Sequence, residues 1–197
     1  MRALLILAVL AAPLLAWATT TGARDLPPRA IEALERGRLY VEVRPDTDGS
    51  SGAVLGVIDI AAPIEVVWKV MTDCDLAPRM VANLKSCRVL ERDPGGRWDV
   101  REFVSRPTVV LPPVRNVFRS EYQPDQRITF RRTGGDLAVF EGEWRVEPHE
   151  GQVRVSYEAH IAAPFSVPGW LARIALRGDV HAALLAFQRE AVARAQP

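Results

Sequence analysis

The sequence contains few of the residues on which catalysis and metal binding most often depend. Only three histidines and two cysteines occur in 197 residues, and the only lysines are Lys69 and Lys85. No Ser/His/Asp or Cys/His grouping can be inferred, and no spacing typical of metal ligands occurs. Basic and acidic residues number 25 and 24, so the chain has no overall basic field for nucleic acid. These absences favour a protein that binds a small molecule over an enzyme with a recognisable catalytic motif.

Long apolar runs are also missing, except at the N-terminus. Arg2 precedes an apolar run from Ala3 to Ala16, which is too short for a transmembrane helix. Residues 16–18 (Ala-Trp-Ala) have the small-x-small pattern of a signal-peptidase site. We therefore expect residues 1–18 to be a signal peptide, cleaved near Ala18, and the product to be periplasmic or secreted. An uncleaved membrane anchor is the alternative.

After residue 38 the chain alternates apolar and polar residues in short runs, the period of strands with one buried face. Turn sequences rich in glycine, proline and aspartate separate the runs, which indicates antiparallel pairing. One face of these strands collects aromatic residues and the opposite face carries charges, so the sheet has one apolar and one solvated side. The expected strands are residues 39–43, 54–60, 87–90, 98–105, 114–122, 127–132, 138–146 and 153–161.

Four helices are expected around this sheet. A short one covers residues 29–36, a second begins at Pro63, and a third covers residues 76–84. The last and longest covers residues 169–195 and is long enough to cross the whole sheet. An apolar stripe along it is expected to cover the apolar face, and it consists of Trp170, Leu171, Ile174, Ala175, Ala182, Leu185 and Val192.

Three stretches resemble the START-like (SRPBCC) superfamily, which includes polyketide cyclases and coenzyme-Q-binding proteins. Residues 57–68 (VIDIAAPIEVVW) resemble a long strand that runs into a proline-started helix. Residues 71–91 resemble the second helix and the return strand, and residues 142–146 (GEWRV) resemble a Gly-x-Trp-hydrophobic strand. One departure is residues 76–78 (LAP), where many members have an aromatic-proline pair.

The resemblance implies an α+β helix-grip fold. Its parts are a curved antiparallel sheet of about six to seven strands, two short helices, and a long C-terminal helix packed on the concave face. After the signal peptide, residues 19–37 are expected to be a helical extension and residues 38–197 the START-like domain.

The same resemblance implies a ligand cavity between the concave face and the C-terminal helix; a filled core is the alternative. Arg101 is expected to bind a carboxylate or lipid head group there, unless it lies at the sheet rim beside a surface acid. His181 is expected to act as an acid or base only if it faces the cavity rather than solvent or the core. The residues expected to bind ligand are Arg101, Phe103, Phe118, Tyr122, Phe130, Phe140, Trp144, Tyr157, Trp170, Ile174, His181 and Leu185.

The two cysteines, Cys74 and Cys87, are expected to form a disulfide, because an even pair in an exported protein favours one. Two independent buried thiols are the alternative. Metal binding is disfavoured, because no histidine lies near either cysteine in the sequence and a single pair supplies too few ligands for zinc.

An apolar loop, residues 108–113 (TVVLPP), is expected between two strands. We expect one of three roles for it: a lid over the cavity, a surface for transient membrane or partner contact, or part of the core.

Three functions remain in competition at this point. The first is an exported, non-catalytic binder or carrier of a hydrophobic small molecule or lipid, with no cofactor and no nucleic-acid partner. The second is an enzyme of the polyketide cyclase or dehydratase type that uses His181 or Arg101. The third is an interaction module with a filled core. The sequence indicates neither the ligand nor the oligomeric state.

Overall fold

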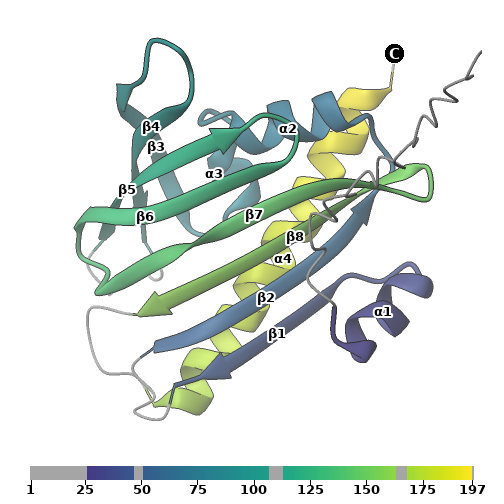
Figure 1. Ribbon diagram of the computed structural model, residues 1–197. Coiled ribbons are helices and arrows are strands. Elements are labelled where there is room, and N and C mark those ends of the chain that lie inside the picture. The colour runs from purple at the N-terminus through teal and green to yellow at the C-terminus, as the bar shows by residue number, and fades with distance from the viewer. Residues whose placement is uncertain (1–25, 47–50, 107–112, 163–167, 197) are drawn as a thin grey trace, which may run out of the picture.

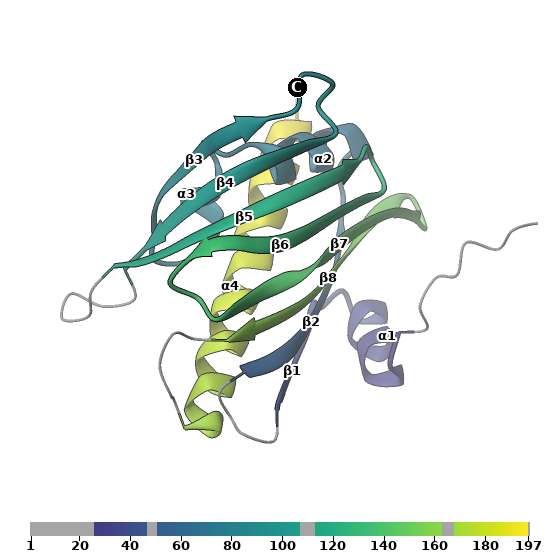
Figure 2. The ribbon, with the colours of Figure 1, turned by 60° about the vertical axis from the view of Figure 1, so that its left-hand side comes forward.

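The computed structural model describes residues 26–46, 51–106, 113–162 and 168–196. Eight strands form one antiparallel sheet and four helices accompany it (Figure 1). The sheet is curved, and the long helix α4 runs diagonally across its concave side (Figure 2). The elements are α1 (Pro28–Glu35), β1 (Tyr40–Pro45), β2 (Ser51–Ile60), α2 (Ile64–Thr72), α3 (Ala77–Met80), β3 (Leu84–Arg92), β4 (Trp98–Ser105), β5 (Val114–Gln123), β6 (Arg127–Gly135), β7 (Val139–His149), β8 (Gln152–Ala162) and α4 (Gly169–Ala195).

The strands lie in the order β1-β2-β8-β7-β6-β5-β4-β3. The six strands from β3 to β8 form a meander, since each pairs with its neighbour in the chain through a short turn or connection. The β1–β2 hairpin then adds to the far side of β8, with Ser51 opposite Ala162 and Ile60 opposite Val153. This arrangement confirms the α+β helix-grip fold. The six to seven strands that the resemblance implied are too few, whereas the eight alternating runs in the sequence correspond to the eight strands, because both β1 and the edge strand β3 pair along their lengths.

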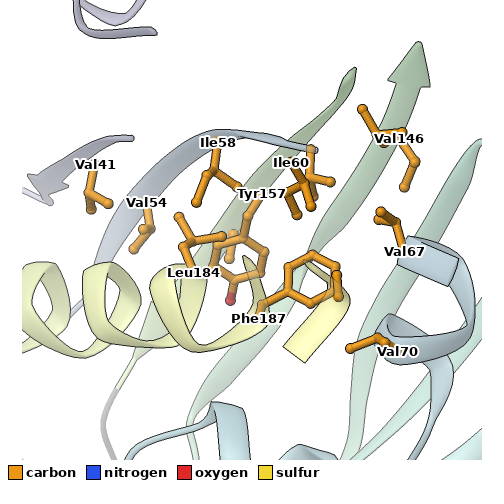
Figure 3. Packing of buried hydrophobic residues seen from close by; sticks show 14 of the residues in the cluster. Val41, Val54, Ile58, Ile60, Val67, Val70, Val146, Tyr157, Leu184 and Phe187 are labelled. Carbon is orange, nitrogen blue, oxygen red and sulfur yellow. The ribbon is translucent and has the colours of Figure 1, made fainter. Parts of the chain in front are cut away.

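Helix α4 begins after Pro168, whose fixed φ suits the residue before a helix, and it packs against β1 and β2 as well as α2 and α3. Leu184 and Phe187 are its largest buried side chains, and Leu184 points toward Tyr157 and Ile58 of the sheet, whereas the ring of Phe187 lies on the side of Ile60 and Val67 (Figure 3). Gly56 of β2 permits this close approach, since a Cβ at that position would lie 2.8 Å from Cδ1 of Leu184. The helix and the β1–β2 hairpin therefore share one buried core.

Helices α2 and α3 cover the other end of the concave side (Figure 2). Val67 and Val70 of α2 are fully buried, and Pro63 precedes the helix as expected. The expected third helix is shorter than predicted, because β3 already begins at Leu84. None of the helices in the described part of the chain is both long and apolar enough to span a membrane. The expected signal peptide, residues 1–18, and most of the apolar loop lie outside the described residues.

Candidate functional site

The concave face of the sheet carries a continuous cluster of aromatic rings. Phe118 on β5 contacts Phe103 on β4 and Phe140 on β7, with ring centroids 4.9 and 5.1 Å apart. Phe130 on β6 lies 4.8 Å from Phe140, and the cluster continues into β8 through Tyr157. These contacts follow from the strand register, which brings side chains of the same parity to one face. The sequence prediction of an aromatic concave face is confirmed.

Helix α4 leaves part of this face uncovered. The helix packs mainly against β1 and β2, at one side of the sheet, whereas the aromatic cluster extends over β4 to β7. Phe103, Phe140 and Trp144 are only half-buried, while Phe118 and Phe130 are buried. A partly exposed apolar surface inside a concave face is the ordinary lining of a small-molecule site.

The stripe of α4 that faces the sheet differs from the one expected. The residues that pack into the core are Leu176, Val180, Leu184, Phe187, Ala191 and Val192. Trp170 and Ile174 are instead 63% and 60% exposed, His181 is exposed and Leu185 is half-buried. Apolar residues occur on every side of this alanine-rich helix, so the sequence alone did not fix which side turns inward. The prediction that Trp170 and Ile174 cover the sheet is wrong.

Arg101 lies on the concave face, as predicted, but its charge is already neutralised. Its Nε lies 3.0 Å from both carboxylate oxygens of Asp99, and its Nη2 donates to the carbonyl oxygen of Thr72 at 2.7 Å. Arg101 and Asp99 are 7% and 2% exposed. Burial lowers the pKa of Arg101, but the interactions with Asp99 and Tyr122 together outweigh burial, so the pKa stays above its ordinary value. The arginine therefore ties β4 to the end of α2 and is not available as a free anion site.

Three buried polar atoms on the same face have no hydrogen-bond partner in the described part of the chain. They are Oδ1 of Asn116, the hydroxyl of Tyr122 and Nε of Arg132. Burial raises the pKa of Tyr122, so this phenol stays protonated and can donate a hydrogen bond. Buried polar groups are nearly always paired, so these three atoms call for a partner such as ordered water or a bound molecule. Polar groups thus lie within the otherwise apolar face, which is the composition that a ligand site requires.

Sequence reasoning found Tyr122 but missed Asn116, Arg132 and Asp99. The alternation of side chains along β5 and β6 was sufficient to place Asn116 and Arg132 on the concave face. Asn116 stands two residues before Phe118, and Arg132 two residues after Phe130, so both share the face of those phenylalanines.

A disulfide joins Cys74, after α2, to Cys87 on β3, with the two Cα atoms 5.5 Å apart. This confirms the predicted pairing. The bond attaches the α2–α3 connection to the edge strand of the sheet, beside Phe103, which lies opposite Cys87 in the β3–β4 ladder. It therefore fixes one wall of the concave face.

Removing this disulfide should destabilise the fold. We expect the double variant Cys74→Ser/Cys87→Ser to lose about 3 kcal/mol of unfolding free energy, because the cross-link no longer restricts the unfolded chain. Urea denaturation of the oxidised protein and the variant measures the difference. A reducing agent should reproduce the loss in the native protein and leave the variant unchanged. Equal midpoints for oxidised and reduced protein would contradict a stabilising role.

The convex face has a different chemistry. Two open depressions of about 480 and 910 Å³ lie on it, and charged side chains of both signs line them. Arg145 pairs with Glu143 at 2.6 Å, and the guanidinium of Arg119 lies 3.9 Å from the ring centre of Trp98. His160 also lies on this side and contacts Asp46. Since these charges are already paired and solvated, this face does not suit an apolar ligand. In the described ranges no group of three or more His, Cys, Asp or Glu residues is arranged to hold a metal ion.

The curved sheet, the long C-terminal helix and the aromatic concave face define a START-like helix-grip protein. The family model described as polyketide cyclase / dehydrase and lipid transport matches residues 60–188, well over half of the chain. The chain therefore belongs to this family.

Solved structures share the fold at low sequence identity. A STAR-related lipid transfer protein from Xanthomonas axonopodis has a TM-score of 0.65 at 18% identity, over 78% of this chain and 93% of that one. The Zhui aromatase/cyclase from a Streptomyces species has a TM-score of 0.57 at 16% identity, over 74% of this chain and 94% of that one. A protein from Thermus thermophilus has a TM-score of 0.62 at 21% identity, over 73% and 99% of the two chains. A search of curated proteins found no significant match.

Proposed function

We propose that this protein is an exported carrier that binds a hydrophobic small molecule or lipid against the concave face of its sheet. The observation that carries the proposal is the aromatic cluster, whose outer members Phe103, Phe140 and Trp144 stay half-buried because α4 packs to one side. A ligand that covered these rings would bury apolar area worth about 25 cal/mol per Å². Membership in a family described by lipid transport as well as cyclisation supports the same function. Export rests on the N-terminal sequence pattern.

Native mass spectrometry of the protein isolated from the periplasm tests this function. We expect a co-purifying apolar molecule, or, after delipidation, saturable binding of at least one member of a panel of lipids and quinones. Trp144 contacts Tyr157 and Phe187, with ring centroids 4.3 and 6.3 Å apart, so binding should change its fluorescence. The matched control is Trp170→Phe, which should leave the signal unchanged, whereas Trp144→Phe should remove most of it. Absence of any bound molecule and of any binding across the panel would refute the proposal.

A cyclase-like or dehydratase-like enzyme is the second candidate, and Tyr122 is the observation that favours it. Its buried, protonated hydroxyl has no partner in the described residues and lies beside the Arg101 guanidinium, which is 5.8 Å from its ring centre. Such a phenol can donate a hydrogen bond to a carbonyl oxygen on which negative charge develops. If turnover of a polyketide-like substrate were found and Tyr122→Phe abolished it, the enzyme would replace the carrier as the leading function.

A further inference from the structure

Arg101 and Arg132 both lie on the concave face, and of the two only Arg101 has an anionic partner among the described residues. Arg101 pairs with Asp99, as described above. Arg132 on β6 lies opposite Phe118, and its Nη2 donates to the carbonyl oxygen of Gly135 at 2.8 Å. Its Nε is buried without an acceptor, and Arg132 forms no ion pair with any described carboxylate. Arg132 as a whole is half-buried, and the part of its guanidinium that is removed from water is costly unless an anion compensates it.

The nearest carboxylate in the sequence, Asp136, accepts from the backbone N–H of Arg115 at 2.7 Å and forms no ion pair with Arg132. Of the internal segments that the structure does not describe, residues 107–112 and 163–167 contain neither aspartate nor glutamate, and residues 47–50 contain Asp48. The neighbouring Arg131 turns to the convex face, where it is 82% exposed and lies 3.9 Å from Glu141. The two adjacent arginines therefore differ: one is solvated and close to a carboxylate, and the other faces the aromatic cluster without one.

A second unpaired polar group stands beside Arg132. Asn116 on β5 is 5% exposed, lies opposite Gly135 in the β5–β6 ladder, and has no partner for its Oδ1. The side-chain amide offers an acceptor in this orientation and a donor when it is turned by 180°. Phe118 separates the pair from Ser120 and Tyr122 farther along the same strand face. Polar recognition is thus concentrated at the end of the cluster formed by Asn116 and Arg132.

We propose that Arg132, with Asn116 beside it, binds the acidic end group of an otherwise apolar ligand. The inference rests on the proposed carrier function and narrows its ligand to molecules that end in a carboxylate or a phosphate. The planar guanidinium fork matches both groups. The apolar remainder of the ligand lies along the half-buried rings of Phe103, Phe140 and Trp144.

Three probes with the same 18-carbon chain test this proposal on the delipidated, full-length mature protein: oleate, oleyl alcohol and oleoyl lysophosphatidate. We expect at least one acidic probe to bind about tenfold more tightly than the neutral alcohol, because its charge is paired in an apolar setting. A preference for oleate identifies a carboxylate ligand, and a preference for lysophosphatidate identifies a phosphate. Isothermal titration calorimetry measures the three affinities.

Two variants and one control test whether Arg132 causes the preference for acidic probes over oleyl alcohol. Arg132→Gln should remove it and leave the affinity for oleyl alcohol unchanged, and Arg131→Gln, on the adjacent but outward-facing residue, should keep it. Asn116→Asp places a carboxylate beside Arg132 and should therefore remove the preference although Arg132 is intact. This variant provides the test if Arg132→Gln does not fold. Equal binding of acid and alcohol by the native protein, or a preference that survives both variants, would overturn this inference and leave the carrier function standing. Failure of all three probes to bind would instead count against the carrier function.

Discussion

Replacement of Asp99 by alanine is expected to lower the free energy of unfolding by about 3–5 kcal/mol. Asp99 is 2% exposed and supplies both acceptors for Nε of Arg101, which is itself buried. Without the carboxylate the guanidinium keeps only the Thr72 carbonyl oxygen among the polar contacts described for it. An uncompensated charge then remains inside the fold, and no ion pair offsets the free energy of its desolvation.

Urea denaturation followed by circular dichroism measures this loss. The matched control is Glu141→Ala, which removes a carboxylate from an exposed pair and should change stability by less than about 1 kcal/mol. The double variant Asp99→Leu/Arg101→Met removes both charges and should recover most of the loss, because apolar side chains can replace a buried pair. A small effect of Asp99→Ala, or a double variant as unstable as the single one, would show that the pair is not buried as described.

Phe187→Ala is expected to have an effect of similar size, about 3–5 kcal/mol. Phe187 is 4% exposed, packs with Leu184 against the sheet and lies 6.3 Å from the ring of Trp144 (Figure 3). Truncation leaves a cavity where α4 meets the sheet and removes the transfer free energy of the ring. Thermal and urea unfolding of the variant measure the loss.

Trp170→Ala on the same helix is the informative control. Trp170 is larger than Phe187 but 63% exposed, so its removal should change stability by no more than about 0.5 kcal/mol. The opposite order, a large loss for Trp170 and a small one for Phe187, would mean that the helix is rotated so that the stripe expected from the sequence faces inward.

Strands and helix limits could be predicted from the sequence because they depend on local patterns. Alternation placed Phe118, Tyr122 and Phe130 on one face, and the structure confirms it. The proline before residue 169 marked the start of the last helix, which indeed covers Gly169–Ala195. The disulfide followed from the pairing of the only two cysteines in the chain.

Local patterns could not predict which side of α4 faces the sheet, nor which polar residues belong to the site. Trp170 and Ile174 form as good an apolar stripe as Val180 and Leu184, and the choice between them depends on Gly56 and the β1–β2 hairpin. The alternation pattern placed Arg101 on the concave face but gave no sign of its partner, since pairing with Asp99 requires side-chain geometry. Arg132 was overlooked because its neighbour Arg131 has the same chemistry and the opposite orientation.

The pairing of β2 with β8 has a consequence for the order of folding. Arg154 and Asp59 form an ion pair across these strands at 2.8 Å although they stand 95 residues apart in the chain. The β1–β2 hairpin has no other sheet neighbour, and its helix cover, α4, comes later still. The intervening loop must close before these contacts can form, and the conformational entropy lost on closing so long a loop slows folding. A chain synthesised from its N-terminus therefore cannot complete this sheet until β8 and α4, which lie in its last quarter, have emerged.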